Sequence, residues 1–104
     1  MNGAATVVTY SVSDENSDQL HHLVATLLIP AARDAPGYRG FLLLNQGEGK
    51  RMAVVLCDSI ESARALQGVL GPIARDHIYS LMTSPSIGTL STVVLSDGVC
   101  AIEP

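Results

Sequence analysis

Two neighbouring segments in the middle of this 104-residue chain are apolar at almost every position. They are residues 41–44 and 52–57, and the glycine-bearing residues 47–50 between them form a connection of hairpin length. Successive side chains of a β-strand point to opposite faces of the sheet. Both faces of the predicted hairpin are therefore apolar, and both need to be covered.

The first half of the chain predicts a strand, a helix and then this hairpin. Residues 5–12 are rich in β-branched side chains and predict the first strand. A helix is predicted over residues 16–34, with Asn16 and Gln19 in the spacing of a capping box and leucines at helical spacing behind them. Pro30 lacks a backbone donor, so we expect it to kink the last turn or to end the helix early. The hairpin strands are predicted at 38–46 and 51–57.

The second half predicts another helix and a fourth strand. Asp58 can cap this helix together with Glu61. We expect Gly71 and Pro72 to divide it into two pieces. The fourth strand is predicted at 89–96, and residues 97–98, Asp-Gly, predict a turn into a short apolar tail at 99–102. We expect that tail either to add an edge strand or to cross to a partner subunit.

This order of elements, βαββαβ, is the ferredoxin-like α+β plan. It implies one domain over residues 1–104, with a four-stranded antiparallel sheet and both helices on one face. The second apolar face of the central hairpin then has no cover within one chain. We therefore predict a homodimer in which two sheets pack face to face.

Charge and composition exclude several classes of partner. The formal net charge is −4 and only six residues are Lys or Arg, which argues against nucleic-acid binding. No apolar run approaches the roughly 18 residues of a membrane span, and no basic residue precedes the first apolar run as in a signal peptide. Cys57 and Cys100 read as free thiols. We expect a cytoplasmic protein with no membrane partner.

Residues 36–41, Pro-Gly-Tyr-Arg-Gly-Phe, the hairpin, and the strand-to-helix turn at 54–63 together resemble the antibiotic biosynthesis monooxygenase-like proteins. That family forms a dimeric α/β barrel. The resemblance implies a ligand pocket between sheet and helices in each protomer, and cofactor-independent oxidation of an organic substrate. It also implies that two sheets build the barrel.

The chain departs from the family at residues that carry chemistry. Members that oxidise polycyclic aromatic substrates use Trp, Asn, Tyr and Arg, and haem-degrading members use a first-strand Asn, a Trp and a His on the second helix. This chain has no Trp, and its first strand has no Asn. His77 lies only in the zone of the haem-ligating His. We therefore do not expect haem degradation, and we predict neither a metal ion nor a cofactor.

Four residues are candidates to line the pocket. His77 lies four residues from both Ile73 and Leu81, so we expect it to face the core or a cavity, where it could act as a ligand, acid or base. The alternative is a partly buried histidine with one hydrogen bond. Tyr10 and Tyr79 could offer hydroxyls to a ligand, although tyrosines are also common at the edge of a core. Asn45 could bind a carbonyl.

Other polar residues have simpler interpretations. His21 and His22 are adjacent, which is the wrong spacing to chelate one metal on a helix. Arg39 could hold an anion or could be an exposed charge at a strand start. Cys57 lies in an apolar run and is expected to be an inert small apolar residue.

The sequence leaves two functional hypotheses. The first is a small-molecule pocket protein similar to the monooxygenases, with oxidation of an organic substrate as its reaction. The second is a non-catalytic binding or assembly module on the same barrel. A fold alone does not decide between them, because one fold hosts many functions.

Overall fold

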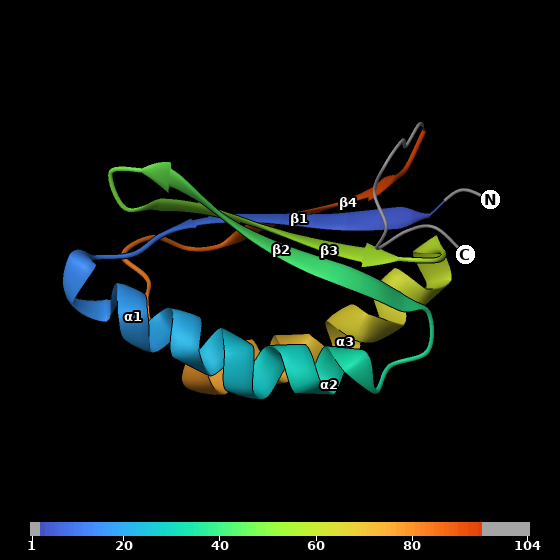
Figure 1. Ribbon diagram of the computed structural model, residues 1–104, viewed down its shortest axis with the longest axis horizontal. Helices are drawn as coiled ribbons and strands as arrows, with labels where there is room; N and C mark the ends of the chain where they lie inside the picture. Colours follow the sequence, from blue (N-terminus) through green and yellow to red (C-terminus); the bar gives the residue numbers. More distant parts are fainter. Residues whose placement is uncertain (1–2, 95–104) are drawn as a thin grey trace.

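The computed structural model describes residues 3–94, which form an antiparallel sheet covered by helices on one face (Figure 1). The elements follow the predicted βαββαβ order. They are β1 (Ala4–Ser11), α1 (Asp14–Leu23), a π-helical segment (Val24–Leu28), α2 (Ile29–Arg33), β2 (Tyr38–Gly47), β3 (Lys50–Cys57), α3 (Ile60–His77), a 3-10 turn (Tyr79–Leu81) and β4 (Ile87–Thr92).

The strands lie in the order β2-β3-β1-β4, and every neighbouring pair is antiparallel. β1 therefore lies inside the sheet, between the hairpin and the short edge strand β4. This arrangement confirms the predicted ferredoxin-like fold.

The core lies between the sheet and the helices and is mainly aliphatic. Val55 of β3 and Leu66 of α3 belong to one cluster of buried residues at the α2 end. Tyr10 of β1 and Leu20 of α1 belong to a second cluster at the other end. Phe41 of β2 packs against both clusters and joins them.

The first helix begins two residues earlier than predicted, and Pro30 does not end it early. It starts at Asp14 after Ser13, so the capping box predicted for Asn16 and Gln19 is wrong, and Asn16 lies in the first turn. Pro30 does not end the helix. The π-helical segment precedes it, with the Ile29 N–H donating to the Val24 carbonyl five residues back. This wider turn accommodates the missing proline donor, and the helix then runs on to Arg33.

The second long helix, α3, is continuous, so the predicted break at Gly71 and Pro72 is wrong. In a helix the proline ring crowds the Cβ of the preceding residue, and residue 71 is a glycine, which has none. Gly68 and Pro72 are also exposed, so water can bind the carbonyl that loses its donor. The absence of a Cβ at residue 71 and the exposure of Gly68 to water thus permit an internal proline.

Ser59, not Asp58, caps α3. Its side-chain oxygen accepts a hydrogen bond from the Ser62 N–H at 3.1 Å. The fourth strand is also displaced: β4 begins two residues before the predicted start and ends at Thr92. The predicted turn and tail at 97–102 lie outside the described residues.

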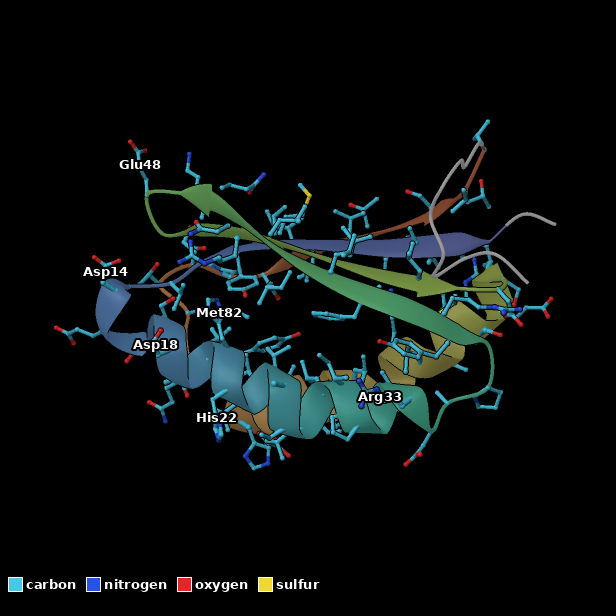
Figure 2. The ribbon with its side chains drawn as sticks, in the orientation of Figure 1. Asp14, Asp18, His22, Arg33, Glu48 and Met82 are labelled. Carbon is cyan, nitrogen blue, oxygen red and sulfur yellow. The ribbon has the colours of Figure 1, made fainter. Side chains whose placement is uncertain are left out.

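The sheet face that points away from the helices is apolar along the hairpin. Leu42 pairs with Val54 and Leu44 with Met52 across β2 and β3, one register position from the core-facing pair Phe41 and Val55. Leu42 is 52% exposed, Leu44 43%, and Ile87 of β4 67%. Figure 2 shows side chains projecting from both faces of the sheet, with helices on only one. Within residues 3–94 no helix covers this apolar surface, as the hairpin sequence predicts.

The turn between α2 and β2 yields a test of this packing. Gly37 has a φ of +82°, and a Cβ there would overlap the side chains of Ser62 and Asp58. Gly47 has a φ of +87°, but a Cβ there would meet nothing. We expect Gly37→Ala to lower the free energy of unfolding by about 1–3 kcal/mol more than Gly47→Ala, because only the first adds a steric overlap to the backbone strain.

Urea denaturation of the two variants measures this difference. Equal losses of stability would show that the α2–β2 turn does not pack against the start of α3 as described.

Candidate functional site

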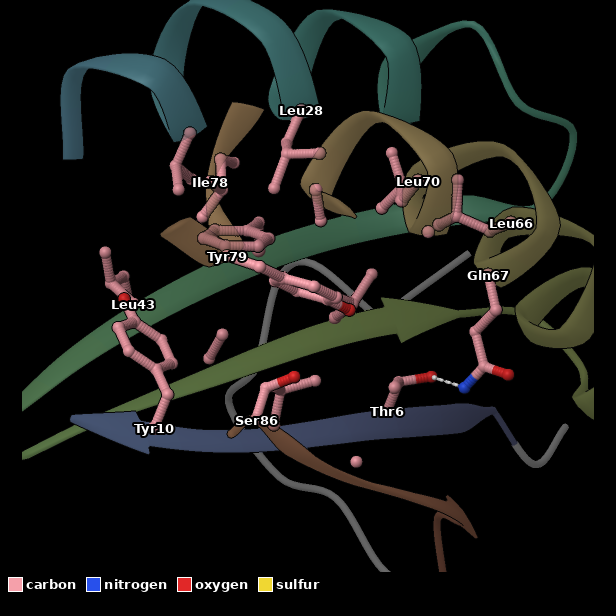
Figure 3. Close-up of a pocket in the computed structure, with 18 of the residues that line it drawn as sticks. Thr6, Tyr10, Leu28, Leu43, Leu66, Gln67, Leu70, Ile78, Tyr79 and Ser86 are labelled. Carbon is pink, nitrogen blue, oxygen red and sulfur yellow. Dashed lines mark hydrogen bonds between the residues drawn. The ribbon is translucent and has the colours of Figure 1, made fainter. Parts of the chain in front are cut away.

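A cavity of about 370 Å³ lies between the sheet and the helices (Figure 3). Its walls are mostly aliphatic or aromatic. From the sheet come Val8, Phe41, Leu43 and Val55, and from the helical layer come Leu28, Leu66, Leu70 and Ile78.

The cavity exists because small residues occupy positions where larger ones would close the space. Ala53 of β3, Ala63 and Ala74 of α3, and Gly88 of β4 all line it. An interior is normally packed to a density that leaves few voids larger than a water molecule. Four small residues around one space therefore indicate room for a ligand.

The π-helical segment contributes to the helical wall of the cavity. Val24 and Leu28, its first and last residues, both line the space. The turn that accommodates Pro30 thus also places two apolar side chains over the cavity. Single π-helical turns within α-helices are frequent at functional sites.

The opening lies between α3 and the edge strand β4. Gln67 of α3, Tyr79 of the 3-10 turn and Gly88 of β4 line the cavity and are exposed. The Gln67 side-chain amide donates to the Thr6 hydroxyl at 3.4 Å, a long hydrogen bond that a ligand could displace at little cost (Figure 3). Thr6 and Gln67 therefore form one polar end of the cavity.

Tyr10 supplies a polar group away from Thr6 and Gln67. The side chain is 7% exposed, and its buried hydroxyl has no hydrogen-bond partner. Burial raises the pKa of Tyr10 and the nearby Arg51 charge opposes that rise. The hydroxyl therefore stays protonated at neutral pH and can donate a hydrogen bond.

The structure brings two of the four predicted site residues to the cavity. Tyr10 and Tyr79 line it, whereas His77 and Asn45 do not. His77 is exposed near the end of α3, because the continuous helix turns Ala74 and Ile78 inward instead. The prediction that His77 faces the core depends on its spacing of four residues from Ile73, which is only partly buried.

Asn45 lies at the turn end of the hairpin. Its side-chain oxygen accepts hydrogen bonds from Arg51 Nη1 at 2.8 Å and from the Gly47 N–H at 2.9 Å. Asn45 therefore stabilises the hairpin turn and holds a buried arginine, away from the cavity.

Sequence reasoning missed Thr6, Gln67 and Arg51. In the sequence, Thr6 looks like any other β-branched residue of a strand. Gln67 looks like a helix residue that faces solvent. The signal for Gln67 was its spacing, four residues after Ala63 and three before Leu70. Arg51 gave no signal, because an arginine at a strand start is usually exposed.

Two other predicted features concern cysteine and histidine. Cys57 is buried, and burial, followed by the neighbouring Asp58, raises the pKa of its thiol, which agrees with an inert apolar role. His22 is exposed on α1 (Figure 2).

Within residues 3–94, no group of three or more His, Cys, Asp or Glu side chains is placed to hold a metal ion. None of the helices there is long and apolar enough to cross a membrane.

Several solved structures are similar to this chain over nearly its whole length. A monooxygenase from the gene ActVA-Orf6 of Streptomyces coelicolor, in complex with nanaomycin D, has a TM-score of 0.77 at 19% identity, covering 91% of this chain and 90% of that one. SnoaB, a cofactor-independent oxygenase from Streptomyces nogalater, has a TM-score of 0.75 at 17% identity, covering 93% and 98%.

A Nitrosomonas europaea protein described as an antibiotic biosynthesis monooxygenase has a TM-score of 0.77 at 16% identity, covering 92% and 94%. The chain shares the fold of these proteins. The fold implied by the sequence resemblance is therefore confirmed. No protein-family model and no curated protein sequence matches the chain.

The raised pKa of Tyr10 predicts a loss of stability at alkaline pH. A folded state that holds the phenol proton more tightly than the unfolded chain loses stability as pH rises past the unfolded pKa of 10.0. We expect Tyr10→Phe to lose less stability between pH 9 and 11 than the wild type. The wild-type loss also contains contributions of the same sign from Tyr38 and Cys57.

Urea midpoints measured across this pH range check the prediction, with Tyr79→Phe as the control, because Tyr79 is 45% exposed. Identical alkaline slopes for wild type and Tyr10→Phe would contradict the burial of Tyr10.

Proposed function

We propose that the chain binds a small, largely apolar organic molecule in the cavity and oxidises it with molecular oxygen. The single observation that carries the binding is the cavity itself, which is walled by apolar side chains and has a few polar groups at separate points. The shared fold with a cofactor-independent oxygenase and a ligand-bound monooxygenase supports the choice of reaction.

In such a reaction the substrate supplies the electrons for oxygen. An activated methylene group is converted to a carbonyl, R₂CH₂ + O₂ → R₂C=O + H₂O, so that one oxygen atom enters the substrate and the other leaves as water. The apolar walls of the cavity would hold the flat body of the substrate and exclude bulk water. Tyr10 would donate a hydrogen bond to a substrate oxygen, and Gln67 and Thr6 would contact the other end.

A second function, non-catalytic binding, is favoured by one specific observation. Among residues 3–94, no Asp, Glu, His, Lys, Arg or Cys lines the cavity. The walls therefore offer no side chain that exchanges a proton near neutral pH. Oxidation in this cavity would require a substrate acidic enough to lose its own proton to water.

We also propose that two chains form a homodimer through the outer sheet face. Leu42, Leu44 and Ile87 leave an apolar surface there, and such surfaces on soluble proteins commonly mark interfaces. The dimer would pair two sheets into the barrel that the family resemblance implies.

Ligand binding is tested by filling the cavity. Ala74→Leu puts a larger side chain at a cavity-lining position, and Ala65→Leu makes the same change at an exposed position of the same helix. With anthrone as the probe, we expect Ala74→Leu to weaken binding about tenfold or more, because the leucine occupies ligand space. Ala65→Leu should bind as the wild type does, and thermal unfolding verifies that both variants fold.

Oxygen consumption with anthrone separates the two functions. Uptake of oxygen above the uncatalysed rate, lost in Ala74→Leu and kept in Ala65→Leu, supports oxidation in the cavity. Binding without oxygen uptake would support the non-catalytic function. Equal binding by both variants would show that the cavity is not the site.

The dimer is tested by charging its proposed interface. We expect Leu44→Lys to convert a dimer to a monomer at micromolar concentration, because a lysine there would be buried without a partner. Val69→Lys is the matched control, since Val69 is 46% exposed on α3 and Leu44 is 43% exposed on β2. Light scattering after size exclusion gives the masses; a monomeric wild type would contradict the proposal.

A further inference from the structure

Residues 67–72 lie in the middle of α3, and three of them disfavour a helix. Relative to an alanine, a glycine inside a helix lowers the helical population about fivefold, and a proline lowers it by about a hundredfold. Gly68, Gly71 and Pro72 place three such penalties within five residues. This segment is therefore the part of α3 with the lowest intrinsic helix propensity.

Packing against the rest of the molecule is not the reason for these glycines. A Cβ added at Gly68 or at Gly71 would meet no other part of the molecule within 4 Å. At Gly37, by contrast, an added Cβ would overlap two neighbouring side chains. Gly71 makes room for the ring of Pro72, but Gly68 has no comparable role. An alanine at residue 68 would strengthen the helix without a clash, so the glycine leaves α3 weaker than its packing requires.

The core holds this segment less firmly than it holds the turns on either side. None of residues 67–72 is buried. Leu66 just before the segment is 2% exposed, and Ala74 just after it is 9% exposed. Pro72 has no N–H, so the Gly68 carbonyl lacks its helical donor. A segment with few buried contacts and an exposed backbone opens locally more readily than its anchored neighbours.

The same segment forms part of the cavity wall at the opening. Gln67, Leu70 and Gly71 line the cavity, and Gln67 lies at the opening between α3 and β4. Figure 3 shows the Gln67 side chain reaching from α3 to Thr6 of β1, to which its amide donates at 3.4 Å. A loosening of residues 67–72 would release this long hydrogen bond and widen the opening.

We propose that residues 67–72 are a gate through which a small molecule enters and leaves the cavity. In the closed state, which the structure describes, the segment is helical and Gln67 is hydrogen-bonded to Thr6. In the open state this turn of helix is lost, whereas the anchored turns of α3 on either side stay in place. The opening step then limits how fast a ligand exchanges, as the opening of lids and loops does in many enzymes. This inference rests on the proposed binding function of the cavity.

Gly68→Ala tests the gate, because it strengthens the helix at an exposed position without a clash. The amides of Leu70 and Ile73 report the opening of the segment, and the amide of Leu66 reports the turn before it. We expect hydrogen exchange of the first two amides, measured by NMR, to slow about fivefold in the variant. Exchange at Leu66 should change by less than about twofold, because the penalty that the alanine removes acts within the gate.

The rate of ligand exchange is the second readout. The probe is anthrone in the absence of oxygen, and quenching of tyrosine fluorescence reports its entry because Tyr10 and Tyr79 line the cavity. By stopped flow, we expect the association and dissociation rates of Gly68→Ala each to fall about fivefold. Kd should stay within about twofold of the wild-type value, because a gate slows entry and exit equally.

Ala65→Gly is the matched control. It makes the reverse change at an exposed position of the same helix, in the turn before the gate. We expect it to lower the urea midpoint, since a glycine weakens the helix there as well, and to leave both ligand rates unchanged.

The outcomes separate the gate from the binding function. If Gly68→Ala binds anthrone with wild-type rates, the gate is overturned and the binding function stands. If Ala65→Gly changes the ligand rates as much as Gly68→Ala does, the overall stability of α3 controls ligand exchange, and the gate is also overturned. If anthrone does not bind to the wild type, both proposals fail.

Discussion

The structure depends on a hairpin that is apolar on both faces. Its register places Phe41 and Val55 toward the helices and Leu42 and Val54 away from them. The helices cover the first face and create the core. They leave the second face open, because a βαββαβ chain returns both of its helices to the same side of the sheet. The hairpin therefore determines where the core forms and which face of the sheet the helices leave uncovered.

The core that the helices create is not filled. Alanines and a glycine at facing positions leave space between the sheet and α3, and the π-helical turn before Pro30 lines it with Val24 and Leu28. A chain with few aromatic residues and no Trp has few large side chains with which to close such a gap. The same small residues that weaken the packing thus give the protein its candidate binding site.

The order of elements was predictable because apolar periodicity and β-branched runs mark each one. Details that depend on single backbone groups were not. α3 stays continuous through Pro72, where the preceding residue, Gly71, has no Cβ to crowd the proline ring, whereas a proline rule applied alone predicts a break. His77 was expected to face inward because it lies four residues from both Ile73 and Leu81, but Ala74 and Ile78 occupy the buried face. Tyr10 lines the cavity, as the sequence hypothesis proposed, whereas Arg51 was missed because its burial depends on α1 lying over it.

The central claim is that the outer face of the hairpin is covered in the working protein. A soluble paramagnetic agent added to the full chain broadens the NMR signals of exposed methyl groups. The account predicts that the Leu42 and Leu44 methyls are protected at high protein concentration, as Leu20 is, and become exposed on dilution. Broadening of Leu42 and Leu44 equal to that of Val69 at every concentration would contradict it.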